Sequence, residues 1–165
     1  MPAPDGAEVD PYQTNMPQSF ACLHFHLIFS TKGRLPLLVG DLPDRLYAYI
    51  GGILRSEKGA LVAAGGMPDH VHLLVSLSRE ASIADTVRQI NGSSSKWIHD
   101  SIPDWRGFAW QAGYAAFAVS YSHIEIVKEY IATQADHHRT VTFQEEFLAF
   151  LQRHNFEFNE RYLWD

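Results

Sequence analysis

The stretch ALVAAGGMPDHVHLLVSL, residues 60–77, contains two strand-like runs joined by a short Pro-Asp turn. Two such runs around a short turn are typical of a β-hairpin. In the second run the residues alternate between two faces, because successive side chains of a strand point to opposite sides of the sheet. One face carries Val71 and Leu73, and the other carries His70 and His72. The pattern predicts a sheet that packs on one side and presents histidines on the other.

The rest of the chain supplies the other elements of a sheet-and-helix domain. Residues 20–31 alternate cleanly, with Leu and Phe on one face and His24 and His26 on the other. Ser82 can cap a helix, and Thr142 with Glu145 three residues later predicts a capping box. The predicted elements are, in order, a strand at 20–31, a helix at 42–58, strands at 60–67 and 70–77, a helix at 83–100, a strand near 109–121 and helices at 123–138 and 143–152.

The order strand–helix–strand–strand–helix–strand predicts the α+β, ferredoxin-like arrangement, also called split βαβ or RRM-like. In this topology the first and third strands are antiparallel central neighbours of a four-stranded sheet. The apolar faces would then lie against two helices on one side, which leaves His70 and His72 on an open face. The antiparallel pairing also puts His70 near the end of the first strand, close to Ser30, Thr31 and Lys32.

Length, composition and charge limit the class of protein. With 165 residues, 46% of them apolar, the chain can bury one sizeable core. We expect a flexible N-terminal tail at 1–18, a main domain at 19–141 and a C-terminal helix and extension at 142–165 packed on it. The net charge of −6 comes from the two ends, 1–11 and 142–165, so it argues against an extensive basic nucleic-acid surface but leaves room for a local one.

Cysteine content and hydropathy exclude other classes. Cys22 is the only cysteine, so an internal disulfide and a multi-thiolate zinc site are excluded, and any metal would need histidine and oxygen ligands. No apolar run reaches the roughly 18 residues of a membrane span, and the N-terminus lacks a signal-peptide pattern. We therefore expect a cytoplasmic protein with no membrane partner.

The His-x-His pair has a metal-binding geometry. Alternate strand positions lie on one side about 6.5 to 7 Å apart, so both imidazoles can reach a single ion. The competing interpretation is a pair of half-exposed histidines without a ligand. His24 and His26 repeat the pattern, but His24 falls at the far end of its strand, so this pair is interpreted as mainly structural, with His26 able to support the metal ligands.

The last predicted helix before residue 142 offers further ligands and a nucleophile. Tyr130 and Gln134 are four residues apart and would share one helix face, with His123 two turns before Tyr130 and His137 and His138 one turn beyond Gln134. A tyrosine packed in the core is the alternative for Tyr130. A phenol with a pKa of about 10 is a poor nucleophile at neutral pH, and a divalent cation helps by polarising the phosphorus it attacks.

Four motifs in order carry a resemblance to a known family. They are HFHLIFSTKGR at 24–34, MPDHVHLLV at 67–75, WQAGYAAFAVS at 110–120 and YIATQADHH at 130–138. Over about two-thirds of its length the chain resembles the single-tyrosine transposases of small bacterial insertion sequences, which are His-hydrophobic-His nucleases and include the repeat-associated tyrosine transposases. The main domain, 19–141, is then expected to be the catalytic domain.

The resemblance implies a role for each matching residue. His70 and His72 correspond to the metal-binding pair, Gln134 to the residue that completes the metal shell, and Tyr130 to the nucleophile. It implies that Mg²⁺ or Mn²⁺ assists cleavage of single-stranded DNA through a 5′-phosphotyrosine link, followed by strand transfer. It also implies a homodimer and recognition of DNA hairpins. Because a His-His-Gln shell is unusual for Mg²⁺, Mn²⁺ is expected to bind better.

The sequence also contains candidate DNA contacts and is compatible with two other functions. Lys32, Arg34, Arg88 and Lys96 are candidates for phosphate contacts, although each can equally be a solvated surface charge. The competing functions are an inactive or domesticated relative that binds hairpin nucleic acid without cutting it, and a metal-dependent hydrolase of a small phosphate ester in which Tyr130 is only structural.

Overall fold

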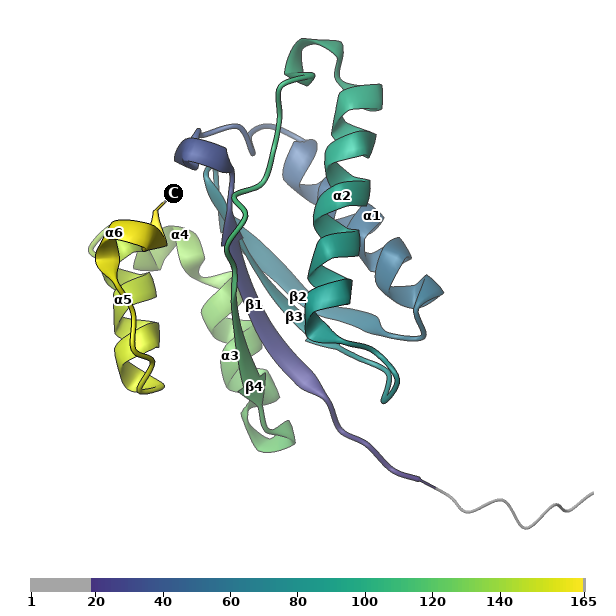
Figure 1. The fold of residues 1–165 in the computed structure, drawn as a ribbon, viewed down its shortest axis with the longest axis vertical. Helices are drawn as coiled ribbons and strands as arrows, with labels where there is room; N and C mark the ends of the chain where they lie inside the picture. The colour runs from purple at the N-terminus through teal and green to yellow at the C-terminus, as the bar shows by residue number, and fades with distance from the viewer. Residues whose placement is uncertain (1–18, 165) are drawn as a thin grey trace, which may run out of the picture.

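Four strands form one antiparallel sheet in the computed structural model, which describes residues 19–164 (Figure 1). They are β1 (His24–Ser30), β2 (Ala60–Met67), β3 (His70–Ser76) and β4 (Ala115–Val119). Their spatial order is β2-β3-β1-β4, and helices connect β1 to β2 and β3 to β4. The order and connections are those of the ferredoxin-like fold, so the predicted fold class is confirmed. The tail expected at 1–18 lies outside the described residues.

The register of the sheet places the histidines as the sequence pattern predicted. β1 and β3 are antiparallel neighbours, with Ser30 opposite His70 and Ile28 opposite His72. His24 lies opposite Ser76, at the other end of the two strands. The two histidine pairs are therefore offset, and only His26 of β1 comes near the pair on β3.

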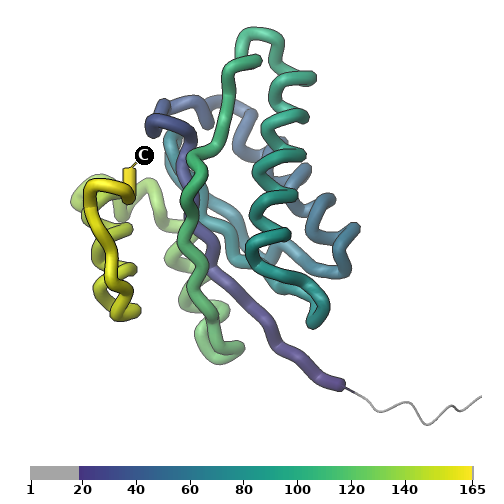
Figure 2. Tube along the Cα trace, viewed as in Figure 1, coloured from purple at the N-terminus to yellow at the C-terminus, as the bar shows by residue number. Residues whose placement is uncertain are grey.

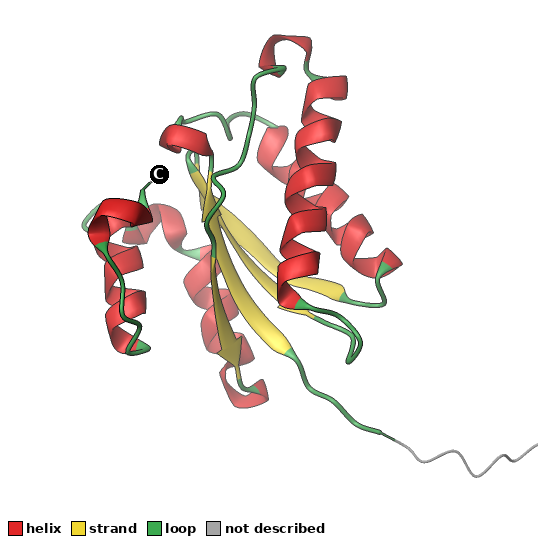
Figure 3. Ribbon diagram, in the orientation of Figure 1, coloured by secondary structure: helices red, strands yellow, loops and turns green. Residues whose placement is uncertain are grey.

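One face of the sheet is covered by α1 (Leu42–Ser56) and α2 (Ile83–Ser101), as predicted (Figure 3). α2 begins where the Ser82 side chain accepts a hydrogen bond from the Asp85 backbone N–H. The main core lies between these helices and the alternating apolar residues of the central strands. Its most buried members include Leu27, Phe29, Leu46, Ile50, Leu54, Val71, Leu73, Val75 and Ile90. Because Val71, Leu73 and Val75 of β3 lie in this core, His70 and His72 point to the other face of the sheet.

The opposite face carries a second layer of helices (Figure 2). These are α3 (Ile124–Ala132), α4 (Gln134–His137), α5 (Phe143–Arg153) and α6 (Glu160–Leu163). The single helix predicted over 123–138 is therefore wrong: a 3-10 turn at Tyr121–His123 precedes α3, and the helix is interrupted at Thr133, whose side chain hydroxyl donates to the Glu129 carbonyl. α5 begins at the predicted capping box. Within the described part of the chain, every helix is too short or too polar to cross a membrane.

Apolar contacts hold α5 against this face. Phe143 and Leu151 of α5 pack on Ile28 of β1 and on Ala115 and Phe117 of β4. Burial of this apolar surface makes docking of the helix favourable at roughly 25 cal/mol per Å². The expectation of an open histidine face is consequently wrong, because α3, α4 and α5 cover it.

A glycine on β2 lets α3 lie close to the sheet. A Cβ atom built at Gly65 would lie only 2.6 Å from the Ile131 carbonyl oxygen and 3.0 Å from a methyl group of the same residue. Only a residue without a side chain permits this approach. Gly65 lies opposite His72 on β3, so the close contact brings α3, with Tyr130 on it, next to the histidine strand.

Candidate active site

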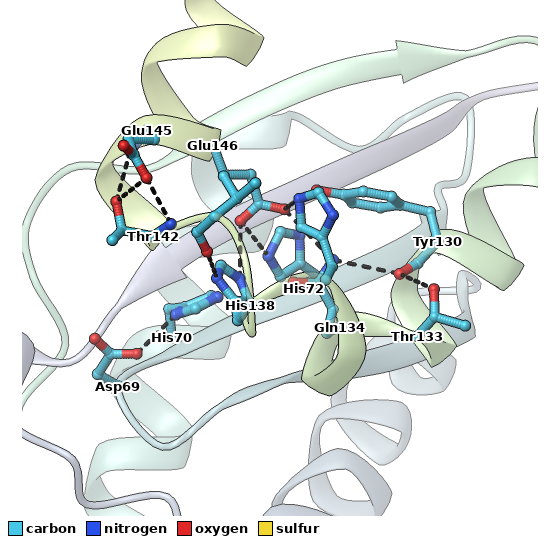
Figure 4. A network of polar contacts seen from close by, with 12 residues as sticks. Asp69, His70, His72, Tyr130, Thr133, Gln134, His138, Thr142, Glu145 and Glu146 are labelled. Carbon is cyan, nitrogen blue, oxygen red and sulfur yellow. Dashed lines mark hydrogen bonds and ion pairs between the residues drawn. The ribbon is translucent and has the colours of Figure 1, made fainter.

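His70 and His72 lie at the centre of a buried polar cluster under α4 and α5 (Figure 4). Their exposed fractions are 1% and 0%. His138, directly after α4, and Glu146 on α5 join them, and the four residues each offer one ligand atom within 4.8 Å of the others. Three imidazoles and a carboxylate meeting in this way form a site that can hold a metal ion.

Each of the three histidines is oriented through its Nδ1 atom. His70 and His138 donate from Nδ1 to oxygen acceptors, and His72 shares a hydrogen bond with another histidine. The contacts are His70 Nδ1 to Asp69 Oδ1 (2.7 Å), His72 Nδ1 to His26 Nε2 (2.9 Å) and His138 Nδ1 to the Val141 carbonyl (2.8 Å). Such contacts fix which ring nitrogen faces the site, as they do for histidines that bind metals. His26 therefore supports His72, as expected from its position.

Several buried polar atoms face the centre of the cluster without a hydrogen-bond partner among residues 19–164. They are His70 Nε2, His72 Nε2, His138 Nε2, Gln134 Oε1 and Glu146 Oε2. Glu146 Oε2 does lie 3.1 Å from His138 Nε2 and 3.6 Å from His72 Nε2. Leaving buried polar groups unsatisfied is costly, and a native cluster of this kind calls for a ligand. The donor set fits a divalent cation.

Burial sets the protonation of the site. It lowers the pKa of His26 to about 3, with a further contribution from the neighbouring His72, and lowers the pKa values of His72 and His138 below the usual 6.5. Burial also raises the pKa of Glu146 to about 7. It would raise the pKa of Asp69 too, but hydrogen bonds from His70 and from an arginine outweigh it, so that pKa is lowered. Neutral imidazoles with free lone pairs are the form that binds metals.

Gln134 is brought to the histidine pair, as the resemblance implied. Its side chain is buried, and its Nε2 donates to the Tyr130 carbonyl (3.3 Å) and to Glu146 Oε1 (3.4 Å). Both donors of the amide point away from the free Oε1 atom, which is the atom that a hard cation would use. The three predicted metal ligands, His70, His72 and Gln134, therefore lie together, and their binding of an ion stays a prediction.

Tyr130 lies at the edge of the same cluster. Its ring centroid is 5.9 Å from that of His72 and 6.1 Å from that of His26. In Figure 4 the ring extends from α3 toward His72 and Glu146. A pocket of about 220 Å³, lined in part by Tyr130, Glu146, Phe150 and Arg153, borders the ring. The phenol is thus only partly buried, unlike the tyrosine of a closed core.

The four candidate basic residues divide between two places. Lys32 and Arg34 directly follow β1 at the histidine end of the sheet, and Arg34 Nη2 lies 3.3 Å from Asp69 Oδ2, the carboxylate that orients His70. Arg88 and Lys96 lie on α2, on the other face, and each pairs with an aspartate of its own helix. The structure does not bring Arg88 and Lys96 to the histidine pair, and DNA contact by any of the four stays a prediction.

The ligand set expected from the sequence lacks two members of the cluster. His138 follows Gln134 by one turn of the predicted helix, whereas Glu146 has no assigned role. A signal for Glu146 existed: it occupies an apolar-face position of α5, three residues after Phe143 and four before Phe150. A carboxylate at a core-facing helix position needs a partner, because burying an unpaired charge is costly.

Comparison with known proteins agrees with the fold. The sequence model of the family described as "Transposase IS200 like" matches residues 19–134. The ISDra2 transposase TnpA of Deinococcus radiodurans is 31% identical over 119 residues, which cover 69% of this chain and 85% of that protein. A crystal structure of a transposase from D. radiodurans R1 superposes with a TM-score of 0.58 at 30% identity, covering 72% of this chain and 95% of the other.

A second solved structure shows the same fold at lower identity. It is described as a REP-associated tyrosine transposase bound to a REP hairpin, with a TM-score of 0.57, 14% identity, and coverage of 78% of this chain and 76% of the other. Fold and relatives place the chain among the tyrosine transposases, which are DNA nucleases and strand transferases. Since the family match covers most of its length, the chain belongs to the IS200-like transposase family.

Proposed function

We propose that this transposase cleaves and rejoins single-stranded DNA by nucleophilic attack of Tyr130 on a phosphodiester, assisted by Mg²⁺ or Mn²⁺ at His70, His72 and Gln134. The observation that carries the proposal is the convergence of the Tyr130 ring with unpartnered, buried ligand atoms of all three residues. When bound, a divalent cation supplies Lewis-acid polarisation of the scissile phosphate.

The residues of the chain perform the other parts of the proposed reaction. The Tyr130 oxygen forms a bond to phosphorus and loses its proton, while the bond to the 3′ oxygen breaks and that oxygen gains a proton. The products are a 5′-phosphotyrosine link and a free 3′-hydroxyl. Because the phosphodiester energy is kept in the covalent link, a 3′-hydroxyl can reverse the reaction at a new junction without another energy source.

We also propose that the DNA is recognised at hairpin ends and that the protein is a cytoplasmic homodimer. Recognition of hairpin ends is supported by the structural relative that is described as bound to a REP hairpin. A homodimer is proposed from the family resemblance, although Tyr130 and the histidines already meet within one chain. Activity on DNA implies a cytoplasmic location.

A covalent-adduct assay tests the nucleophile. Protein is incubated with labelled single-stranded DNA from the ends flanking its own gene, with Mn²⁺ or EDTA, and adducts are resolved on a denaturing gel and mapped by mass spectrometry. We expect a Mn²⁺-dependent adduct on Tyr130 that Tyr130→Phe abolishes while DNA binding persists. Tyr121→Phe is the matched control, because Tyr121 is 77% exposed, whereas the cluster is buried.

Other outcomes would change the assignment. Adduct formation by Tyr130→Phe at the wild-type rate would remove Tyr130 from the reaction. Tight binding of the DNA without any metal-dependent product would favour the relative that binds hairpins without cutting. Turnover of a simple phosphodiester by the Phe variant would favour a small-ester hydrolase.

A further inference from the structure

Two of the ligand atoms in the cluster come from a part of the chain that the family match does not reach. The match ends at Gln134, whereas His138 follows α4 and Glu146 lies on α5. The side chains of His138 and Glu146 are 6% and 3% exposed. The segment 135–153 therefore adds one imidazole and one carboxylate to a site otherwise built from the matched domain.

The positions of these two residues suit ligation. His138 Nε2 and Glu146 Oε2 face His70 and His72, and the two atoms lie 3.1 Å apart as an ion pair. Among the described residues neither atom has a hydrogen-bond partner. Their other polar atoms are engaged: His138 Nδ1 donates to Val141, and Glu146 Oε1 accepts from Gln134. Each side chain is thus held by one atom and directs the other into the cluster.

The distances are close to those of a bound shell. An ion about 2.0 to 2.2 Å from each donor keeps any two donors within about 4.4 Å of one another. The four candidate donor atoms of His70, His72, His138 and Glu146 lie within 4.8 Å. The upper limit of 4.8 Å is therefore within about half an ångström of the widest separation that a bound shell allows.

We propose that His138 and Glu146 are metal ligands, so that a first-row transition ion such as Mn²⁺, Co²⁺ or Zn²⁺ binds to three imidazoles, a carboxylate and the Gln134 amide, and in doing so ties α5 to the sheet. This inference rests on the proposed function, because it concerns the same metal site. Imidazole-rich donor sets favour such ions over Mg²⁺, which prefers oxygen ligands and retains its water.

Coupling to α5 follows from where the ligands lie. Glu146 belongs to α5 itself, and His138 precedes it by a short connection. Apolar contacts of Phe143 and Leu151 already dock the helix. An ion bound to groups on both β3 and α5 adds a cross-link present only in the docked arrangement, so metal binding must stabilise that arrangement.

Metal titration of the full chain, freed of metal, tests the ligand set. Binding of Co²⁺ is followed by its visible absorption and by calorimetry, and Mg²⁺ is titrated in parallel. We expect Glu146→Gln and His138→Gln each to weaken Co²⁺ binding at least about tenfold. The matched controls, Glu80→Gln and His123→Gln, alter exposed residues that do not belong to the cluster and should change Co²⁺ affinity less than twofold.

Hydrogen exchange supplies a second measurement that does not depend on DNA cleavage. We expect Co²⁺ to slow amide exchange in α5 of the wild type and to have little effect in Glu146→Gln. Equal Co²⁺ affinity for wild type and both variants, or unchanged exchange in α5, overturns the inference. If Glu146→Gln does not fold, His138→Gln decides the question by the same two readouts.

The outcomes separate this inference from the proposed function. If a Tyr130 adduct forms and substitution of His138 and Glu146 leaves metal affinity unchanged, only the assignment of these two residues as ligands is refuted. Metal affinity that depends on both residues, with no adduct on any bound DNA, upholds the ligand set and refutes strand cleavage.

Discussion

Replacement of Glu146 by Gln should make the metal-free protein more stable at alkaline pH. Burial raises the pKa of Glu146 from an ordinary 4.5 to about 7. Because the folded-state pKa is raised, the stability linked to this group is fully present below about pH 4.5 and is lost as the pH rises through about 7. Gln has the same shape, cannot ionise and keeps hydrogen-bonding capacity, so it removes the cost of the buried charge.

The magnitude follows from the size of the shift. Each pKa unit corresponds to about 1.4 kcal/mol, so the shift of about 2.5 units costs the wild type roughly 3 kcal/mol above pH 8. At pH 5 most of that cost is absent, because the folded carboxyl still holds its proton. We expect the stability difference between Glu146→Gln and wild type to grow by about 2 to 3 kcal/mol from pH 5 to pH 8.

Urea unfolding in EDTA at pH 5 and pH 8, followed by circular dichroism, measures this difference. Taking the variant minus the wild type at each pH largely cancels the contribution of His26, whose lowered pKa affects both proteins. His72 and His138 lie within 3.6 Å of Glu146 Oε2, so their contributions stay coupled to that of Glu146. Glu80→Gln, at an exposed position, is the control and should show no pH-dependent gain. A difference between Glu146→Gln and wild type that is the same at both pH values would refute the buried-carboxylate argument.

Three further substitutions test the way the site is built. Gly65→Ala places a Cβ 2.6 Å from the Ile131 carbonyl oxygen, so α3 must shift. We expect the free energy of unfolding in urea to fall by about 1 to 3 kcal/mol and adduct formation to be slower. Wild-type values for both quantities would contradict this. Thr142→Ala removes the capping box of α5 and should cost about 1 kcal/mol by the same measurement. Arg34→Gln should reduce the slope of log binding constant against log salt concentration for single-stranded DNA by about 0.7, measured by fluorescence anisotropy. Arg88→Gln on α2 should leave that slope unchanged. The reverse result would indicate that DNA binds to the face of the sheet that carries α2.

The sheet could be predicted because its signals are local. Alternation in β1 and β3 assigns each side chain to a face, and the order of elements selects the ferredoxin-like topology. With the topology set, the pairing of Ser30 with His70 follows, and the structure has this register. The capping signals at Ser82 and Thr142 were equally local, and both helices begin where predicted.

The composition of the site was only partly predictable. The spacing of His70 and His72 on one strand, and of Gln134 four residues after Tyr130, is visible in the sequence, and the family resemblance implies that these residues form a metal site with its nucleophile. The break at Thr133 could not be predicted, because no proline or glycine marks it, although the backbone there leaves helical geometry at φ −100° and ψ 16°.

By itself, the sequence determined the strand faces, the topology and the two histidines that share a face, because these depend on periodicity over a few residues. Tertiary structure alone decided that the histidine face is closed and that His138 and Glu146 join it. That outcome depends on where α5 docks, which is set by apolar contacts of Phe143 and Leu151 with distant strands. Hydrophobic packing is non-directional, so a helix pattern shows which face is buried but not which residues it will meet.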